Sequence, residues 1–516
     1  MSALTSSQRW QRSEQLKQIK DSDVDVLVIG GGASGAGVFL DALSRGLSCA
    51  LIDKQDFTAG TSSRSTKLVH GGVRYLEQAV KELNIGKYQL VREALAERRR
   101  MLEMAPHLAW KLNLVTPVKG LIGLPYFRIG LGVYDILSGS QKIGPSRIES
   151  KQTLKRICPD INTKPLTGAV SYYDGQFDDA RFGVSMVRTG LEMGGQAVNY
   201  TEVTKLLKTD GQVSGATCVD RISGQSFDIR AKAVVNCTGP WTDKLRQMAD
   251  PDVKPMMTVS SGVHLLVDRN LLPQGHGILI PETEDGRVLF MLPWLGKTLV
   301  GTTDDPAELT DSPQVSEQEI DYILRTCNGW LETPIERSEV TASWSGLRPL
   351  VSDPQAQSTA SLTRDHVILN DNGLISLTGG KWTTWRKMAE DCVDEVIAHF
   401  SFTASACKTC DLKLIGAQGD RAAAEAALAN LPDDIRLHLW QAYGDRARYV
   451  IEGSTRRLVE GQPYIEAELD WIIEYEGAVT ADDVLNRRLR VGMLDDAVAE
   501  QLRPLIQQKL ETALAA

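Results

Sequence analysis

Residues 24–37, VDVLVIGGGASGAG, decide the fold. The first six residues are apolar and largely β-branched, which is typical of a buried β-strand. A GxGxxG motif follows at 30–35, and the helix-compatible run AGVFLDALSRG occupies 36–46. A second apolar run, CALI at 49–52, ends in Asp53, roughly 20 positions after the glycines. Strand, glycine-rich turn, helix and second strand in this order predict a βαβ unit that binds a dinucleotide.

Each position of this motif has a physical task. Gly30 permits the tight turn, Gly32 lets the backbone approach a pyrophosphate, and Gly35 allows close packing of helix on strand. The N-terminus of the helix, where Ser34 lies, attracts phosphate groups. Asp53 would accept hydrogen bonds from the adenosine ribose. We therefore predict that Gly30, Gly32, Ser34, Gly35 and Asp53 bind the dinucleotide.

The residues after Asp53 favour FAD over NAD. They form a polar loop, KQDFTAGTSSRSTKLVHGG at 54–72, rich in Gly, Ser and Thr. An NAD domain would continue with another helix and parallel strand, whereas hydroxyls and backbone amides suit the pyrophosphate and flavin of FAD. The chain has no second GxGxxG, so no separate nicotinamide site is expected. Electrons that leave the flavin must then pass to a quinone, oxygen or another carrier.

The bulk composition narrows the class of protein. A chain of 516 residues predicts two to four domains, and its net charge of −9 argues against nucleic acid as a main partner. The eight cysteines are scattered and suit a reducing cytoplasm. Cys407 and Cys410 form a CxxC, but a zinc site needs a second ligand pair. We expect no metal.

Nothing in the sequence predicts a secretory signal or a membrane-spanning helix. The first 20 residues are charged and lack an apolar core, and Lys119, Arg128 and Asp135 interrupt the most apolar stretch, 119–139. A buried domain element is one interpretation of 119–139. A surface that dips into a bilayer interface is the other.

Seven ordered motifs over residues 22–395 carry a resemblance to a known family. They are GGGASGAG, GTSSRSTKLVHGGVRYLE, VVNCTGPWTD, LVGTTD, SGLRPL, TRDH and TGGKWTTWRKMAE. In this order they resemble the FAD-dependent, membrane-associated respiratory glycerol-3-phosphate dehydrogenases, of the glycine- and D-amino-acid-oxidase-like flavoproteins. A calcium-loop pattern is absent from the sequence, so calcium control is not expected. The chain is also shorter than the oxygen-using members, which favours a quinone as acceptor.

The resemblance implies further roles. Most of the 61–71 segment would wrap the FAD, because hydroxyls and glycine amides satisfy phosphate and flavin oxygens. Beyond the dinucleotide motif, the implied cofactor-binding residues are Thr61, Ser62, Ser63, Lys67, Leu68, His70, Gly71, Thr238, Gly239, Gly380 and Thr383. The implied substrate-binding residues are Arg74, Tyr75 and Arg364, since an arginine fork holds a phosphate dianion bidentately.

The implied reaction oxidises sn-glycerol 3-phosphate to dihydroxyacetone phosphate, with a hydride passing from C2 to flavin N5. The implied catalytic residues around C2 and its hydroxyl are His264, Arg348 and Lys381. His264 lies in an apolar strand-like run, SSGVHLLVD, where a hydrogen-bonded core histidine is the alternative interpretation. Lys381 would place positive charge near flavin N5 or the substrate oxygen at a helix N-terminus. Which residue takes the proton stays open.

The expected fold is α/β, with a Rossmann-like FAD-binding domain, an antiparallel-sheet substrate cap and a helical C-terminal domain. The expected FAD-binding segments are 22–95, 170–260 and 345–398. The expected cap segments are 96–169 and 261–344, and the C-terminal domain is 400–516. Alternating apolar runs in 261–344 and helical spacing after 400 support this division.

The expected partners are glycerol 3-phosphate, a membrane quinone and the membrane surface, and a homodimer is compatible with the sequence. We expect a cytoplasmic chain attached peripherally to the inner face of the cytoplasmic membrane. The alternatives are an oxygen-reducing alpha-glycerophosphate oxidase, a flavin amine oxidase, and a flavin-binding regulator without turnover.

Overall fold

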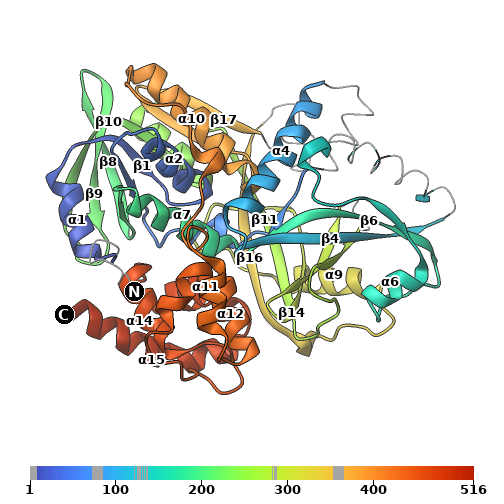
Figure 1. Cartoon of the computed structure of the whole chain (residues 1–516). Helices are drawn as coiled ribbons and strands as arrows, with labels where there is room; N and C mark the ends of the chain where they lie inside the picture. Colours follow the sequence, from blue (N-terminus) through green and yellow to red (C-terminus); the bar gives the residue numbers. More distant parts are fainter. Residues whose placement is uncertain are drawn as a thin grey trace.

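The computed structural model describes residues 9–72, 85–120, 123–124, 130, 132, 134, 138–281, 283, 287–352 and 365–515. They form two sheets that lie beside each other and a helical C-terminal part, which in the view of Figure 1 lies below the first sheet and to the left of β14 of the second. The predicted α/β fold, with an antiparallel second sheet and a helical C-terminal part, is confirmed.

The first sheet carries the dinucleotide motif and has the strand order β17-β18-β10-β1-β2-β7. Its strands are β1 (Val24–Ile29), β2 (Cys49–Ile52), β7 (Gln196–Val198), β10 (Ser226–Asn236), β17 (His366–Asp371) and β18 (Leu374–Gly379). All neighbours pair in parallel except β17, which pairs antiparallel with β18. The hairpin of β8 (Thr201–Thr209) and β9 (Gln212–Asp220) extends β10.

Helices bury both faces of the first sheet. Val26 and Val28 of β1 share a hydrophobic cluster with α2, and Leu27 and Ile29 belong to a second cluster, because alternate side chains of a strand point to opposite faces. The first cluster includes residues of α2 (Ala33–Ser44), α7 (Asp179–Glu192) and α10 (Trp385–Phe400), and the second includes residues of α1 (Arg12–Asp21) and α8 (Thr242–Ala249). The apolar run of 24–29 follows from this two-sided burial.

The second sheet, which we call the cap sheet, has the order β15-β11-β14-β13-β12-β4-β6-β3, with β16 paired to β11 and β5 to β6. Most of its pairs are antiparallel. The strands are β3 (Leu68–Val69), β4 (Ala109–Lys119), β5 (Arg147–Glu149), β6 (Leu166–Phe177), β11 (Met257–Val267), β12 (His276–Ile280), β13 (Leu289–Trp294), β14 (Lys297–Gly301), β15 (Asp305–Pro306) and β16 (Val340–Val351).

Different elements cover the two faces of the cap sheet. Helices α6 (Lys151–Ile157) and α9 (Glu317–Asn328) bury one face. Helix α4 (Ile85–Met104) and two residues of the C-terminal part, Met493 and Leu494, pack on the other. The short strand β3 comes directly from the polar loop after Asp53, so the loop predicted to hold FAD ends inside the cap sheet.

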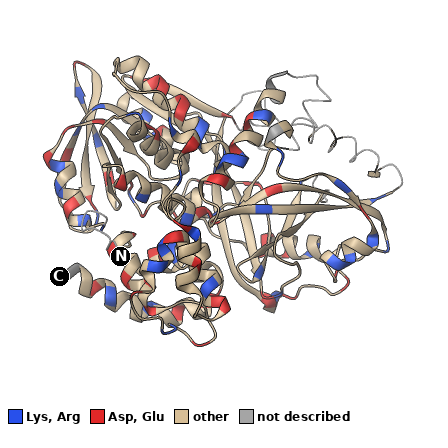
Figure 2. Ribbon diagram, in the orientation of Figure 1, with Lys and Arg blue, Asp and Glu red and all other residues tan. Residues whose placement is uncertain are grey.

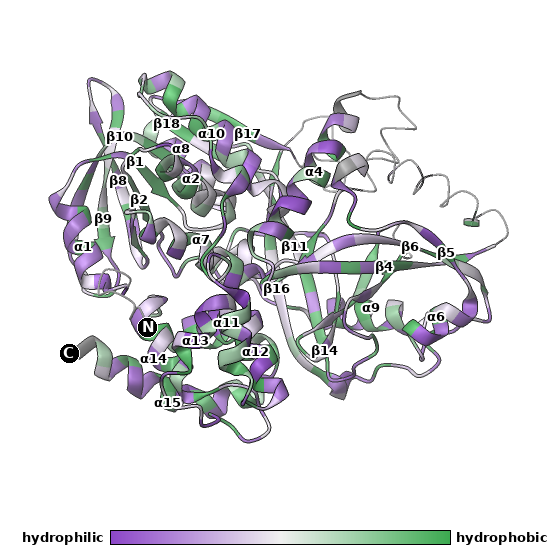
Figure 3. Ribbon diagram, in the orientation of Figure 1, coloured by the Kyte–Doolittle hydropathy of each residue, from purple (hydrophilic) through white to green (hydrophobic). Residues whose placement is uncertain are grey.

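The C-terminal part is built from helices with an apolar and a polar face, which Figure 3 shows as green and purple sides. The helices are α11 (Arg421–Leu428), α12 (Asp433–Tyr443), α13 (Ala447–Val450), α14 (Glu466–Tyr475) and α15 (Asp496–Ala515). Their apolar faces form two clusters of their own, as expected for a domain with its own core.

Buried arginines connect this C-terminal part to the sheets. Three of them, Arg487, Arg488 and Arg490, lie at or just after the end of a π-helical turn, and another, Arg181 of α7, binds Glu476 of the C-terminal part. Arg487 and Arg488 bind Asp56 in the loop after β2, and Arg490 binds Asp179 at the start of α7. Figure 2 shows basic and acidic residues interspersed over the C-terminal helices. The contact between the domains thus includes buried ion pairs.

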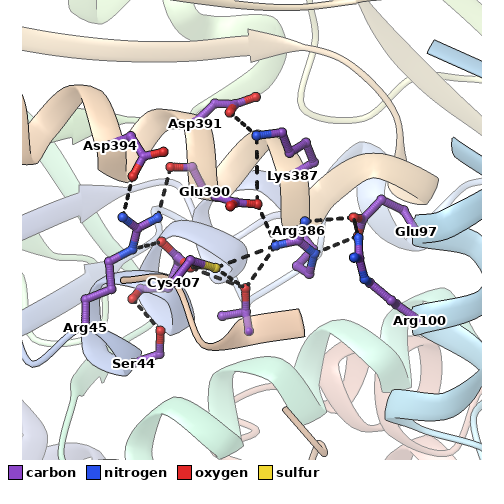
Figure 4. A network of polar contacts seen from close by, with 12 residues as sticks. Ser44, Arg45, Glu97, Arg100, Arg386, Lys387, Glu390, Asp391, Asp394 and Cys407 are labelled. Carbon is purple, nitrogen blue, oxygen red and sulfur yellow. Dashed lines mark hydrogen bonds and ion pairs between the residues drawn. The ribbon is translucent and has the colours of Figure 1, made fainter. Parts of the chain in front are cut away.

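A second network joins α2, α4, α10 and the chain that enters the C-terminal part (Figure 4). The guanidinium of Arg386 donates two hydrogen bonds to Glu97, of 2.8 and 2.7 Å, and one to Glu390 of 2.8 Å. The thiol of Cys407 donates to Asp41 at 2.9 Å. Burial and this bond raise the pKa of the Cys407 thiol. Among the described residues no group of three or more His, Cys, Asp or Glu side chains could hold a metal ion.

The domain boundaries expected at 170 and 345 fall inside strands of the cap sheet. They lie within β6 and β16, each of which is one continuous strand. The pairing of β6 with β4 and of β16 with β11 is long-range, so it leaves no local mark in the sequence.

Candidate active site

The residues predicted to bind FAD gather at one edge of the first sheet. Strands β1, β2, β10 and β18 are parallel, so their carboxyl ends meet at the same edge. The segments that follow them are Gly30–Gly32, Asp53, Cys237–Gly239 and Gly380–Lys381. This edge is where open α/β sheets bind their ligands.

The glycines of the motif lie where side chains would collide with backbone. A Cβ on Gly35 would lie 1.8 Å from the carbonyl oxygen of Gly30. A Cβ on Gly30, whose φ is +104°, would lie 2.5 Å from the carbonyl oxygen of Cys237. The glycines therefore bring the start of α2 against β1 and β10, and the start of that helix is the part that would face a pyrophosphate.

Asp53 keeps the capacity to bind a ribose. One of its oxygens accepts the Gly31 N–H at 2.7 Å and the other accepts the Gln55 N–H at 2.8 Å. A carboxylate offers about four acceptor positions, so acceptor capacity is left over. Burial raises the pKa of Asp53 to about 6. Bound ribose hydroxyls would supply donors for the remaining lone pairs.

The loop 61–71 is held in place mainly by contacts to its backbone and hydroxyls. Ser62 Oγ accepts the Ala33 N–H at the start of α2 at 2.9 Å, and Thr61 Oγ1 donates to the carbonyl of Leu347 in β16 at 2.5 Å. The His70 N–H donates to Thr383 Oγ1 at 3.2 Å. The loop thus bridges the dinucleotide motif, the cap sheet and the segment before α10.

Two of the predicted cofactor residues point into the protein. The Lys67 ammonium is fully buried, donates to Asp179 Oδ2 at 2.6 Å and to the carbonyl of Ser63 at 2.7 Å. Burial lowers the pKa of Lys67 to about 8, although the charge of Asp179 acts in the opposite direction. The Ser63 side chain is also buried. Lys67 therefore orders the loop from within, and its carbonyl accepts the Phe177 N–H at 3.1 Å.

The turns after β10 and β18 complete the edge. Thr238 Oγ1 donates to Asn236 Oδ1 at 2.7 Å, and Gly239 has a φ of +57°. Gly379 and Gly380 have φ values of +74° and +72°, and Lys381 precedes the turn that opens α10.

His264 lies in β11 of the cap sheet, beside the loop 61–71. Its ring is buried and stacked on Trp344 of β16, with centroids 5.6 Å apart, and its Nε2 is 2.9 Å from Thr66 Oγ1. No described residue bonds its Nδ1. Burial, together with the charges of Lys67 and Arg348, holds the pKa of His264 well below 6.5. The lowered pKa favours the neutral form of the imidazole.

Arg348 lies on β16, beside β11 and near the predicted catalytic histidine. Its guanidinium donates to Asp304 Oδ1 at 3.0 Å, to the carbonyl of Thr303 at 3.0 Å and to the hydroxyl of Thr302 at 3.1 Å. These bonds fix the guanidinium against the turn after β14. The structure thus brings His264 and Arg348 together beside the loop 61–71.

Three predicted substrate residues, Arg74, Tyr75 and Arg364, lie outside the described residues. Helix α4 follows the first two in the chain and β17 follows the third.

Comparison with known proteins gives the family. Residues 25–386 match the FAD dependent oxidoreductase family, and residues 407–515 match the C-terminal domain of alpha-glycerophosphate oxidase. The probable mitochondrial glycerol-3-phosphate dehydrogenase of Dictyostelium discoideum is 44% identical over 96% of this chain and 81% of its own length. The mitochondrial glycerol-3-phosphate dehydrogenase of Mus musculus is 42% identical over 96% of this chain and 71% of its own.

The chain belongs to the FAD-dependent glycerol-3-phosphate dehydrogenase family.

A solved structure agrees with this family. The glycerol-3-phosphate dehydrogenase of Bacillus halodurans complexed with FAD matches with a TM-score of 0.78 and 28% identity, over 97% of this chain and 93% of that chain. The predicted cofactor, FAD, is confirmed by the family. The glycine contacts and the spare acceptor capacity of Asp53 fit that cofactor.

Three residues of this dehydrogenase that contact predicted site residues were missed from the sequence. Thr66 bonds His264, Trp344 stacks on it, and Asp179 binds Lys67. Thr66 lies within the quoted loop motif, so its hydroxyl was a usable signal. Trp344 and Asp179 lie 80 and more positions from their partners, and only strand pairing and helix placement bring them close.

Replacing Gly35 with Ala should weaken FAD binding by at least about tenfold, or about 1.4 kcal/mol. The new methyl group would meet backbone at 1.8 Å, so α2 would have to move away from β1. The FAD-to-protein ratio after gel filtration and a fluorescence titration of the apoprotein measure the effect. Gly329→Ala is the control, because its Cβ would meet nothing closer than 3.5 Å. Equal FAD affinity in Gly35→Ala and the parent would contradict the prediction.

Proposed function

We propose that this dehydrogenase oxidises sn-glycerol 3-phosphate to dihydroxyacetone phosphate and passes the electrons to a membrane quinone. The observation that carries the proposal is the buried, neutral ring of His264, whose Nδ1 has no partner among the described residues. A substrate hydroxyl would supply that partner. The printed names of the relatives, glycerol-3-phosphate dehydrogenase, support the substrate.

His264 is the residue that we propose as the base. Oxidation of a secondary alcohol removes a proton from the hydroxyl oxygen and a hydride from the carbon. A neutral imidazole at hydrogen-bond distance takes the proton, and Thr66 Oγ1 orients the ring through Nε2. When bound, FAD supplies the acceptor for the hydride. Arg348 and Lys381 would add positive charge near the substrate oxygen.

The phosphate of the substrate is assigned to Arg74, Tyr75 and Arg364, on the resemblance of their motifs alone. Guanidinium forks suit a phosphate dianion, because they bind two of its oxygens at once. The remaining cofactor contacts proposed above stay assigned to the backbone and hydroxyls of 61–71 and to Thr238, Gly239, Gly380 and Thr383.

Anaerobic addition of glycerol 3-phosphate tests the proposal. The yellow flavin spectrum should bleach, and glycerol without phosphate at the same concentration should not bleach it. An unbleached spectrum in the FAD-loaded protein would exclude the dehydrogenase function. A flavin amine oxidase would instead bleach with an amine or amino acid.

The electron acceptor is tested separately. The match of 407–515 to a domain named for alpha-glycerophosphate oxidase favours oxygen as the second candidate. Turnover with a water-soluble quinone and little peroxide would support quinone reduction. Peroxide formed at the full rate of substrate oxidation would assign the chain to the oxidases.

Contact with a membrane is part of the quinone proposal. In the described part of the chain, every helix is too short or too polar to cross a bilayer. Most of the stretch 119–139 lies outside the described residues. The N-terminal 20 residues are the other candidate surface, but Trp10 and Ile19 of that stretch are buried in the protein. Peripheral attachment to the cytoplasmic membrane predicts that the protein sediments with membranes and is released by a salt or carbonate wash.

A further inference from the structure

A buried carboxylate, Asp179, joins the C-terminal domain to the loop that carries the site. It lies at the first position of α7 and is fully buried. Its Oδ2 accepts the Ser65 N–H at 3.1 Å, the Ser65 hydroxyl at 2.8 Å and the Lys67 ammonium at 2.6 Å. Its Oδ1 accepts the Arg490 guanidinium at 3.0 Å. One carboxylate thus holds two residues of the loop and one of the C-terminal domain.

The residue between Ser65 and Lys67 is the one that bonds the proposed base. Thr66 Oγ1 lies 2.9 Å from His264 Nε2. Because both neighbours of Thr66 are fixed on the same oxygen of Asp179, the position of the Thr66 hydroxyl depends on that carboxylate. Trp344 adds a second link, since it stacks on His264 and its ring centroid lies 5.2 Å from the Lys67 ammonium.

Both the backbone conformation and the side-chain contacts of Arg490 hold it at Asp179. It has a left-handed backbone conformation, with φ of 68°, and its side chain is 2% exposed. It bonds the carbonyl of Asn486 at 2.7 Å and lies 3.4 Å from Asp178 Oδ1. The buried charges balance, with Lys67 and Arg490 against Asp178 and Asp179. Loss of either cation would leave a buried carboxylate short of a donor, which is costly.

We propose that Arg490 of the C-terminal domain is a positioning residue for the active site, which acts through Asp179 on Ser65–Lys67 and so on His264. The C-terminal domain then takes part in substrate oxidation without touching the substrate. This inference rests on the proposed function of His264. It gives a domain of otherwise unassigned use a defined task in the reaction.

The test compares Arg490→Met with Arg490→Lys and the parent, all as FAD-loaded full-length protein. Stopped-flow reduction by glycerol 3-phosphate separates the limiting rate of flavin reduction from the half-saturating substrate concentration. We expect Arg490→Met to lower the limiting rate about 10- to 100-fold, the scale of a displaced catalytic group, with half-saturation changed less than about threefold. Arg490→Lys keeps the charge and should recover part of the rate.

A second readout does not depend on turnover. Hydrogen–deuterium exchange of a peptide covering 61–72 should speed up in Arg490→Met, because the amides of Ser65 and Lys67 lose their fixed acceptors. Peptides from the cap helix α9 should exchange as in the parent. Arg457→Met is the matched control, since Arg457 is also a C-terminal arginine that binds one aspartate, Asp434, at 2.7 and 2.9 Å, but at the surface.

The outcomes separate this inference from the proposed function. A FAD-loaded Arg490→Met protein that is reduced at the parent rate, or whose 61–72 peptide exchanges normally, overturns the positioning role. If Arg490→Met is reduced slowly but His264→Gln is reduced at the parent rate, Arg490 does not act through His264. A parent protein that glycerol 3-phosphate does not reduce overturns the function instead. If Arg490→Met does not fold, two other variants test the same series of contacts. Thr66→Val should lower the rate of flavin reduction, and Ser65→Ala should speed up hydrogen–deuterium exchange of the 61–72 peptide.

Discussion

Replacing Asp56 with Asn is expected to lower the free energy of unfolding by about 3–5 kcal/mol, the scale of breaking a buried ion pair from one side. Asp56 is fully buried and binds two arginines of the C-terminal domain. Arg488 reaches both of its oxygens, at 2.8 and 3.0 Å, and Arg487 adds a bond of 2.6 Å. The amide keeps the shape of the side chain but leaves both cations without this counter-charge.

The pH dependence of this effect has a definite sign. Burial alone would raise the pKa of Asp56, but the charges of Arg488 and Arg487 outweigh it and hold the pKa well below its usual range. A carboxylate whose folded pKa is depressed stabilises the fold at pH above its unfolded pKa of about 3.9, and that stability is lost as the pH falls through the folded pKa. The difference in the free energy of unfolding between parent and variant should therefore have its full size at neutral pH and decrease only in strong acid.

Urea titration followed by tryptophan fluorescence measures the difference in the free energy of unfolding between parent and variant. Both proteins are titrated at equal FAD concentration, and the transition to compare is the one that reports the contact between the domains. Asp470→Asn is the control, because its partner Lys509 lies in the same domain and its side chain is 66% exposed. Such surface pairs contribute about 0–1 kcal/mol. An Asp56→Asn protein no less stable than Asp470→Asn would show that Asp56 does not hold the domains together.

Replacing His264 with Gln is expected to slow flavin reduction by glycerol 3-phosphate about 10²- to 10⁴-fold, the usual contribution of a general base. The substrate would still bind, because its phosphate is assigned to other residues. Glutamine keeps a polar side chain in the buried position but cannot take a proton from the hydroxyl. Anaerobic stopped-flow absorbance measures the rate, with FAD content checked first.

The pH profile of the parent protein makes the prediction sharper. Burial, Lys67 and Arg348 hold the pKa of His264 well below 6.5. The ring is then neutral through the range of about pH 6 to 8, so its protonation should not depress the reduction rate there. The rate should fall only on the acid side of that range. His399→Gln, at an exposed histidine of α10, should behave as the parent. A parent-like rate in His264→Gln would remove His264 from catalysis.

The sequence alone was sufficient for the fold of the first sheet and for the cofactor. The apolar run 24–29, the GxGxxG spacing and Asp53 act locally, because a turn, a helix start and a strand end depend on neighbouring residues. The structure confirms the strand, β1 at Val24–Ile29, and the helix after it, although α2 at Ala33–Ser44 begins three residues before the predicted run 36–46 and ends two before its end. The family could also be predicted from the sequence, because each of its motifs is a continuous stretch of the chain.

The surroundings of the proposed base required the tertiary structure. His264 could be a core histidine or a site residue by its sequence, and its contact with Thr66 spans 198 positions. Asp179 meets Arg490 across 311 positions and Asp56 meets Arg488 across 432. No periodicity or local motif encodes such pairs, because they form only when separate elements pack and exclude water from their charges. Local sequence thus determined how the cofactor's βαβ unit is built, and long-range packing decided which buried charges surround the site and connect it to the C-terminal helices.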